Sequence, residues 1–234
     1  TVLMNAFLSP MTHIIHQNRG TIDKYMGDAI MAFWGAPLRD SDHARHAVQA
    51  ALAMHQGMEE LAESFIQRGW KPLKIGIGLN TGTMNVGNMG SDFRLAYTVL
   101  GDAVNLGSRL ESLTKQYGVN IMISEYTKAA VSDLVTRELD QVRVKGKDQP
   151  VRIYEPVGFE GEVDATTLAG LAEYHEALEL YRRQKWLEAS AAFNALAAKE
   201  PGRLIHTTYL DRIQHFIAEP PGPNWDGVYT HKEK

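Results

Sequence analysis

The sequence predicts an α+β sandwich with a mostly antiparallel sheet, flanking helices and an all-α appendage at the C-terminal end. Over residues 1–158, helical apolar spacing alternates with short β-branched runs in the order helix, hairpin, helix, hairpins, helix, strand, helix, hairpin. From Thr166 onward, apolar side chains recur at helical spacing alone, up to a proline-rich tail. We therefore expect one domain over residues 1–158 and a helical appendage with an extended tail over residues 159–234.

Composition narrows the classes of function. The chain has 234 residues, 44% of them hydrophobic, which is enough for one good core. It contains no cysteine, which excludes disulfides, thiol nucleophiles and thiolate metal sites. The net charge is −4 with dispersed cations, and no apolar run is long enough to cross a bilayer. We expect a cytoplasmic domain with no nucleic-acid partner and no membrane contact from this segment. A membrane anchor of the parent protein would lie outside this sequence.

The opening segment predicts a helix. Leu3, Phe7, Met11 and Ile15 recur at helical spacing. Pro10 allows two interpretations, because proline either occupies the first turn of a helix or kinks a continuous one. A second apolar stripe runs from residue 44 to residue 65, and we interpret its methionines as core side chains.

A tight hairpin is predicted over residues 21–34. Its two arms are rich in β-branched and aromatic residues, and Gly27-Asp28 lies between them. The turn would present the Asp28 carboxylate at the end of two strands. Taken alone, Asp28 is explained equally well as ordinary turn chemistry, since aspartate is common in turns.

The middle of the chain predicts further strands at residues 73–79, 83–89 and 93–100, and then a helix over residues 102–116. Asn105 and Arg109 are separated by one helical turn and share a face of that helix. The glycines between residues 76 and 90 do not form a Walker-type phosphate loop, because no Gly-Lys-Ser/Thr follows them.

These residue types suit phosphoryl chemistry. A carboxylate at a hairpin tip, such as Asp28, is a ligand for a hard cation that also binds substrate phosphates. Asn105 and Arg109 offer fixed donors to a phosphoryl group and a ribose oxygen. Lys145, in the run VKGK at residues 144–147, is placed to hold a polyphosphate. The alternative is that Arg109 and Lys145 are ordinary solvated cations.

Two long motifs resemble one family. The run GTIDKYMGDAIMAFWGAP at residues 20–37 resembles the metal-site hairpin of class III nucleotide cyclases. The run YTVLGDAVNLGSRLE at residues 97–111 resembles the transition-state segment of the same family. The resemblance covers about residues 1–158, and it implies a ferredoxin-like, cyclase-type sandwich.

The resemblance implies a role for each matching position. Asp28 matches the second metal-binding aspartate, and Asn105 and Arg109 match the transition-state residues. Lys24 and Thr98 match the pair that selects the purine, and the remaining match is Lys145 with the lysine that binds the triphosphate. Thr98 stands where many members carry aspartate, as in the subgroup often stimulated by bicarbonate.

The implied activity is that of an adenylyl cyclase, which converts ATP to 3′,5′-cyclic AMP and pyrophosphate with Mg²⁺ or Mn²⁺. The implied partner is a second copy of the chain in a head-to-tail homodimer, with active sites shared across the interface. The family's first metal aspartate lies on a strand before the opening helix, so we expect it upstream of Thr1. Two alternatives stay open, namely a guanylyl cyclase and a non-catalytic, nucleotide-binding regulatory fragment.

Overall fold

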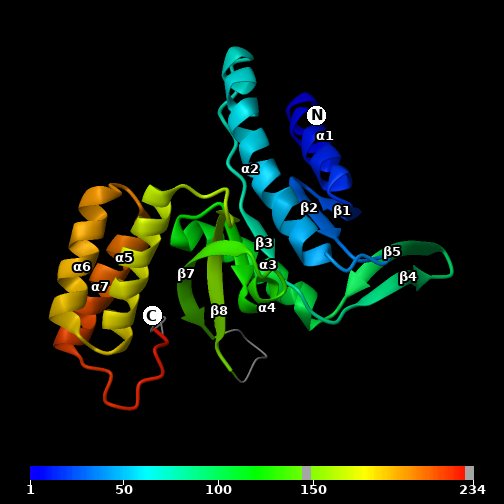
Figure 1. Ribbon diagram of the computed structural model, residues 1–234. Coiled ribbons are helices and arrows are strands. Elements are labelled where there is room, and N and C mark those ends of the chain that lie inside the picture. The colour runs from blue at the N-terminus through cyan, green and yellow to red at the C-terminus, as the bar shows by residue number, and fades with distance from the viewer. Residues whose placement is uncertain (144–148, 230–234) are drawn as a thin grey trace. The chain divides into compact units, whose positions relative to one another are not determined.

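The computed structural model describes residues 1–143 and 149–229. The chain divides into two compact units, one formed by Thr1–Thr114 with Asn120–Ser132 and the other by Lys115–Val119 with Asp133–Lys234. The alternation of helices and strands confirms the predicted α+β class (Figure 1). Within the described ranges, no helix has the length and apolar character that crossing a membrane requires.

The first unit contains four helices and six strands, although residues 115–117 of α3 are assigned to the second unit. In chain order they are α1 (Val2–Gln17), β1 (Thr21–Met26), β2 (Ala29–Phe33), α2 (His43–Gln67), β3 (Ile77–Leu79), β4 (Asn85–Ser91), β5 (Arg94–Leu100), α3 (Asp102–Tyr117), β6 (Ile121–Ser124) and α4 (Glu125–Ala129).

Helices α1 and α2 pack side by side over the β1–β2 hairpin (Figure 1). Their shared core contains Phe7, Met11 and Ile15 of α1 together with Met54, Met58 and Phe65 of α2. This confirms the predicted apolar stripes and the core role of the methionines. Pro10 lies inside one continuous helix. Of the two interpretations, the one in which the helix runs through Pro10 is therefore correct, and a helix start at Pro10 is wrong.

The strands of the first unit form three pairs. β1 with β2 and β4 with β5 are antiparallel, whereas β3 and β6 are parallel. β3 begins at Ile77, four residues later than the sequence pattern predicts. The preceding Leu73 and Ile75 pack instead against the α1–α2 core. Their apolar alternation therefore reflects burial without strand pairing.

Gly78 allows α3 to pack closely against β3. A Cβ atom added at Gly78 would lie 2.2 Å from the Glu111 nitrogen and 2.4 Å from the Gly107 carbonyl oxygen. No side chain fits in that space, so glycine permits the strand and the helix backbone to approach. This close approach fixes the buried side of α3, and it leaves Asn105 on the exposed side of the helix.

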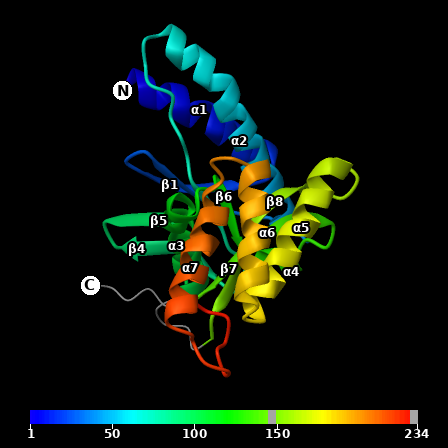
Figure 2. The same ribbon diagram turned by 90° about the vertical axis from the view of Figure 1, so that its left-hand side faces the viewer.

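The described residues of the second unit form two strands and three further helices: β7 (Leu134–Val142), β8 (Val151–Phe159), α5 (Ala165–Arg182), α6 (Trp186–Lys199) and α7 (Leu204–Ala218). β7 and β8 form an antiparallel pair. The three helices lie alongside one another, as Figures 1 and 2 both show.

Aromatic side chains fill the centre of these three helices. Phe193 of α6 stacks on Tyr209 of α7, with ring centroids 4.9 Å apart. Tyr174 of α5 donates a hydrogen bond to the Glu138 carbonyl of β7, and Tyr209 donates one to the Leu139 carbonyl. Leu139 is the residue left out of the β7–β8 register, between Glu138, which pairs with Tyr154, and Asp140, which pairs with Ile153. The tail is anchored, because the Trp225 ring contacts three aromatic rings of the bundle.

Candidate active site

The β1–β2 turn places a carboxylate at an exposed tip. Met26 pairs with Ala29, so Gly27 and Asp28 are the two turn residues. Gly27 has a φ of +64°, a conformation that glycine adopts at little cost in the first position of such turns. The Asp28 side chain is exposed at the end of both strands, as the sequence predicts.

Lys24 and Thr98 are brought together by a third residue, Asp23. The Thr98 hydroxyl donates to Asp23 Oδ2 across 2.6 Å, and the Val99 backbone nitrogen donates to the same oxygen across 3.0 Å. The Lys24 ammonium lies 3.3 Å from the other oxygen, Oδ1. The Asp23 side chain is 1% exposed, whereas that of Lys24 is 47% exposed. A buried carboxylate therefore sets a donor on β1 beside a hydroxyl on β5.

A β-bulge explains why Asp23 reaches β5. In the β1–β2 register, Ile22 pairs with Ala32 but Lys24 pairs with Met31, which leaves Asp23 as an extra residue. Ile22 packs into the α1–α2 core, and Tyr25 hydrogen-bonds to α1 through Thr12. Regular alternation would put residues 22 and 25 on opposite faces of the strand, and one inserted residue restores both to the same face. Asp23 is thereby free to turn toward β5.

Asn105 and Arg109 lie where the sequence predicts, one turn apart on α3. Leu106 and Leu110 are buried on a neighbouring face of the same helix, about 100° around its axis, at 3% and 0% exposure. Asn105 is exposed and Arg109 is half-buried. The helix thus presents an amide and a guanidinium from one face, which suits the recognition of a phosphoryl group.

The donor set for a metal ion is partial. Within residues 1–143 and 149–229, no group of three or more His, Cys, Asp or Glu side chains is arranged to hold a metal. Mg²⁺ is usually bound by one or two carboxylates together with substrate phosphates and water. Asp28 fits the role of one such carboxylate, but it does not make a closed site. Lys145 lies outside the described residues, and its role stays a prediction.

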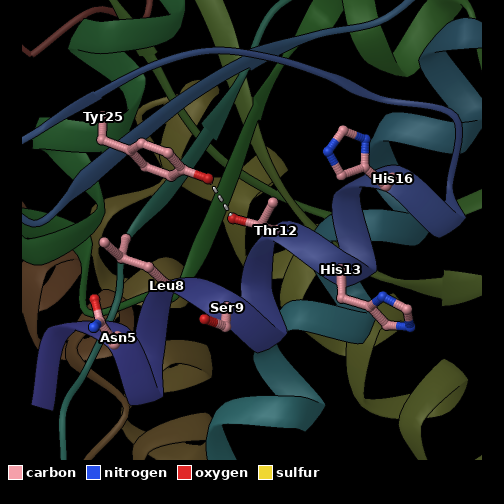
Figure 3. Close-up of a pocket in the computed structure, with 7 residues that line it drawn as sticks. All are labelled: Asn5, Leu8, Ser9, Thr12, His13, His16 and Tyr25. Carbon is pink, nitrogen blue, oxygen red and sulfur yellow. Dashed lines mark hydrogen bonds between the residues drawn. The ribbon is translucent and has the colours of Figure 1, made fainter. Parts of the chain in front are cut away.

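An open hollow of about 550 Å³ lies on the other side of β1, against α1 (Figure 3). Its floor includes the hydrogen bond between Thr12 and Tyr25, and its rim includes the exposed His13 and His16. The complete lining is Asn5, Leu8, Ser9, Thr12, His13, His16 and Tyr25. Tyr25 follows Lys24 on the strand, so the two side chains leave β1 on opposite faces. None of the site residues predicted within the described ranges lines this hollow.

Residues 1–155 match the family described as the adenylate and guanylate cyclase catalytic domain. The chain belongs to this family. The match includes both motifs of the cyclase domain, the β1–β2 hairpin and the segment from β5 into α3, together with every described residue predicted for the site.

Relatives of this cyclase domain include adenylate cyclases. It is 35% identical over 171 residues to adenylate cyclase 1 of Rhizobium meliloti, covering 73% of this chain and 26% of that protein. It is 39% identical over 160 residues to the adenylate cyclase of Anabaena cylindrica, covering 65% of this chain and 31% of that protein. The chain therefore spans less than a third of either relative.

Solved structures of both nucleotide specificities resemble the cyclase domain. The adenylyl cyclase CyaB from P. aeruginosa matches with a TM-score of 0.63 and 37% identity, over 70% of this chain and 85% of that one. The guanylyl cyclase Cya2 matches with a TM-score of 0.63 and 35% identity, over 69% of this chain and 81% of that one. Overall similarity does not separate adenylyl from guanylyl activity.

Sequence reasoning missed Asp23. The only signal was an aspartate within a β-branched arm, since aspartate is depleted in strands. That signal shows that something unusual occurs at residue 23, but it does not reveal the partner 75 residues away.

Proposed function

We propose that this cyclase domain is an adenylyl cyclase acting as a homodimer. The 3′-oxygen of the ribose attacks the α-phosphorus of ATP, and a new O–P bond forms. The bond from the α-phosphorus to the bridging oxygen of the β-phosphate breaks, so pyrophosphate leaves and the 3′-hydroxyl proton is released. The products are 3′,5′-cyclic AMP and pyrophosphate.

The observation that carries the choice of ATP is the pairing of Lys24 with Thr98. An ammonium is only a donor, and a threonine hydroxyl can accept. Adenine presents an acceptor at N1 beside a donating 6-amino group, whereas guanine presents a donor at N1 beside an acceptor at O6. Lys24 and Thr98 together thus match the edge of adenine. The identity to adenylate cyclases supports the same choice.

The other residues act on the phosphates. Asn105 and Arg109 would orient the ribose and stabilise the charge that develops on the α-phosphoryl oxygens, which is the main contribution a protein makes to such reactions. Lys145 would bind the terminal phosphates. Asp28 would bind Mg²⁺ or Mn²⁺, which would supply charge neutralisation at the phosphates when bound.

We further propose a head-to-tail arrangement of the two copies, as membership of the family suggests. Asp28 of one copy would serve the site whose Asn105 and Arg109 belong to the other. Lys24 and Asp28, four residues apart on one hairpin, would then serve different sites.

The test is to measure cyclic AMP from ATP and cyclic GMP from GTP, using the protein at its natural length with Mg²⁺ or Mn²⁺, with and without bicarbonate. We expect cyclic AMP formation that Asp28→Ala and Arg109→Ala each abolish or nearly abolish. Lys71→Ala, which removes an exposed cation of the same unit, should leave the rate unchanged. Preferential formation of cyclic GMP would favour the guanylyl alternative. Nucleotide binding without either product would favour a regulatory domain.

A further inference from the structure

We propose that Asp23 is a specificity-determining positioning residue, which fixes the Thr98 hydroxyl as a hydrogen-bond acceptor toward the purine and holds Lys24 beside it as the donor. This inference rests on the proposed function, because it assumes that Lys24 and Thr98 face the base. It concerns a residue that need not touch the nucleotide at all.

The direction of the Thr98 hydrogen bond follows from chemistry. A carboxylate only accepts hydrogen bonds, so at a separation of 2.6 Å the Thr98 hydroxyl must be the donor to Asp23 Oδ2. This length lies in the range of charge-assisted O–H···O⁻ bonds, which are stronger than neutral ones. The one hydroxyl hydrogen is therefore committed to Asp23. Only the oxygen lone pairs of Thr98 remain for a ligand.

The same carboxylate places the donor. Lys24 Nζ lies 3.3 Å from Asp23 Oδ1, while Oδ2 is held by Thr98 and by the Val99 backbone nitrogen. The backbone contact anchors the carboxylate to β5 independently of any side chain. A donor and an acceptor are thus held next to each other by one rigid group that is 1% exposed.

This pattern opposes guanine at two positions. The N1–H of guanine would face the Lys24 ammonium, and O6 would face a Thr98 oxygen that has no hydrogen left to give. Sites whose polar groups are left unpaired by the wrong ligand reject it strongly. A threonine without such a partner could rotate its hydroxyl and donate to O6. Asp23 removes that freedom.

A purely structural role for Asp23 predicts a different result. If Asp23 only joins β1 to β5, its loss should lower kcat/KM for ATP and kcat/KM for GTP by the same factor. If Asp23 sets the direction of the Thr98 hydrogen bond, its loss should lower kcat/KM for ATP relative to kcat/KM for GTP. The ratio of kcat/KM for ATP to that for GTP therefore separates the two roles.

The principal variant is Asp23→Asn, which keeps the size of the side chain. If the amide nitrogen takes the place of Oδ2, it donates to the Thr98 hydroxyl oxygen and releases the hydroxyl hydrogen for guanine O6, but it also faces the Val99 N–H, so this orientation is the less favourable one. If the amide oxygen faces Thr98, the NH₂ group instead faces the Lys24 ammonium and displaces it. Either orientation breaks half of the adenine pattern. We expect the ATP-to-GTP ratio to fall at least about tenfold.

Two controls match this variant. Asp40→Asn removes another carboxylate of the same unit that is 7% exposed and bonded to His46 and to a backbone nitrogen, and it should leave the ratio unchanged. Thr98→Ser keeps the hydroxyl and should preserve the ratio. Thr98→Val removes the hydroxyl, and we expect it to lower kcat/KM for ATP without raising kcat/KM for GTP.

The readouts are kcat/KM for each nucleotide and equilibrium binding of 3′-deoxy ATP and GTP analogues, which cannot cyclise, by calorimetry. Because binding needs no turnover, an inactive wild-type protein would count against the proposed function while still testing Asp23. A fall in the ratio for Asp23→Asn alone among the aspartate variants supports the proposal. An unchanged ratio, or equal losses for both nucleotides, overturns it. If Asp23→Asn does not fold, an unchanged ratio in Thr98→Val overturns it equally.

Discussion

The Arg212 guanidinium of α7 and the Asp140 carboxylate of β7 form a buried ion pair, with 2.7 Å between Nη1 and Oδ2 and each side chain 4% exposed. The Tyr117 hydroxyl, at the end of α3, donates to the same carboxylate oxygen across 2.6 Å. The guanidinium carbon also lies 4.6 Å from the ring centroid of Tyr229 in the tail. One ion pair thus ties four segments of the second unit together.

Removing only the cation of this ion pair should strongly destabilise the folded protein. Arg212→Met leaves the Asp140 charge buried without its cation, and we expect a loss of about 3–5 kcal/mol in the free energy of unfolding. Urea denaturation measures it. Adding Asp140→Asn removes the stranded charge, so the double variant should be less destabilised than the sum of the two single variants.

The matched control for this prediction is Arg143→Met. Arg143 pairs with Asp226, but their side chains are 54% and 45% exposed. An exposed pair of this kind typically contributes up to about 1 kcal/mol. Equal losses in Arg212→Met and Arg143→Met would contradict the importance of burial.

A second prediction concerns acid stability. Partial burial alone would raise the pKa of Glu200, but hydrogen bonds from Arg137 and His206 outweigh it and lower the pKa from 4.5 to about 2. The unfolded chain therefore binds the proton more readily, so the stabilisation is complete above pH 4.5 and is lost as the pH falls toward 2. Glu200→Gln should cost about 1 kcal/mol at pH 7, allowing for partial exposure of the side chain.

The measurement is the urea midpoint of wild type and Glu200→Gln between pH 7 and pH 3. The difference between them should narrow below pH 4.5, because the unfolded wild-type chain takes up a proton at this carboxylate while the folded protein keeps it ionised. Glu173→Gln serves as a control, since its pair with Lys199 is 49% and 61% exposed and should contribute little at any pH. A difference that widens on acidification would be incompatible with the lowered pKa.

Local patterns made most of the fold predictable. The β1–β2 turn follows from Gly27-Asp28 between two apolar arms, and α3 follows from its apolar spacing, which also places Asn105 and Arg109 on one face. The extent of β3 was not predictable, because Leu73 and Ile75 are partly buried against the α1–α2 core but lie outside the strand. A segment whose alternate side chains are buried shows the same alternation of apolar and polar residues whether or not it pairs as a strand.

Asp23 shows a deeper limit. A bulge depends on the register between two strands, and register is a property of the pair that neither strand encodes alone. The sequence therefore predicted Lys24 and Thr98 as functional residues, by resemblance, but not the carboxylate that joins them. The predicted domain boundary at residue 158 stays a prediction as well.

A third prediction concerns the rate of the reaction. Arg109→Ala should lower kcat by roughly 10²–10³ with little change in KM, because a donor aimed at charge that develops in the transition state contributes mainly to the chemical step. Steady-state cyclic AMP formation measures both constants, with Lys71→Ala as the control. A raised KM with an unchanged kcat would instead make Arg109 a ground-state binding residue.

The last prediction uses the two copies of the chain. Asp28→Ala and Arg109→Ala homodimers should each be nearly inactive, because every site in them carries one lesion. In a mixed dimer with shared sites, one site receives both lesions and the other receives neither. Random exchange makes about half of the dimers mixed, each with one intact site, so roughly a quarter of the wild-type activity should return.

The measurement is cyclic AMP formation by the mixture against each variant alone, with the two variants carrying different tags so that exchange is verified by pull-down. Mixing Arg109→Ala with Asn105→Ala is the matched control. Both residues lie on the same helix of one copy, so every site in that mixture still lacks one of them and no activity should return. Verified exchange of Asp28→Ala with Arg109→Ala and no recovery would place both residues in a single chain's site, and the head-to-tail arrangement would then be wrong.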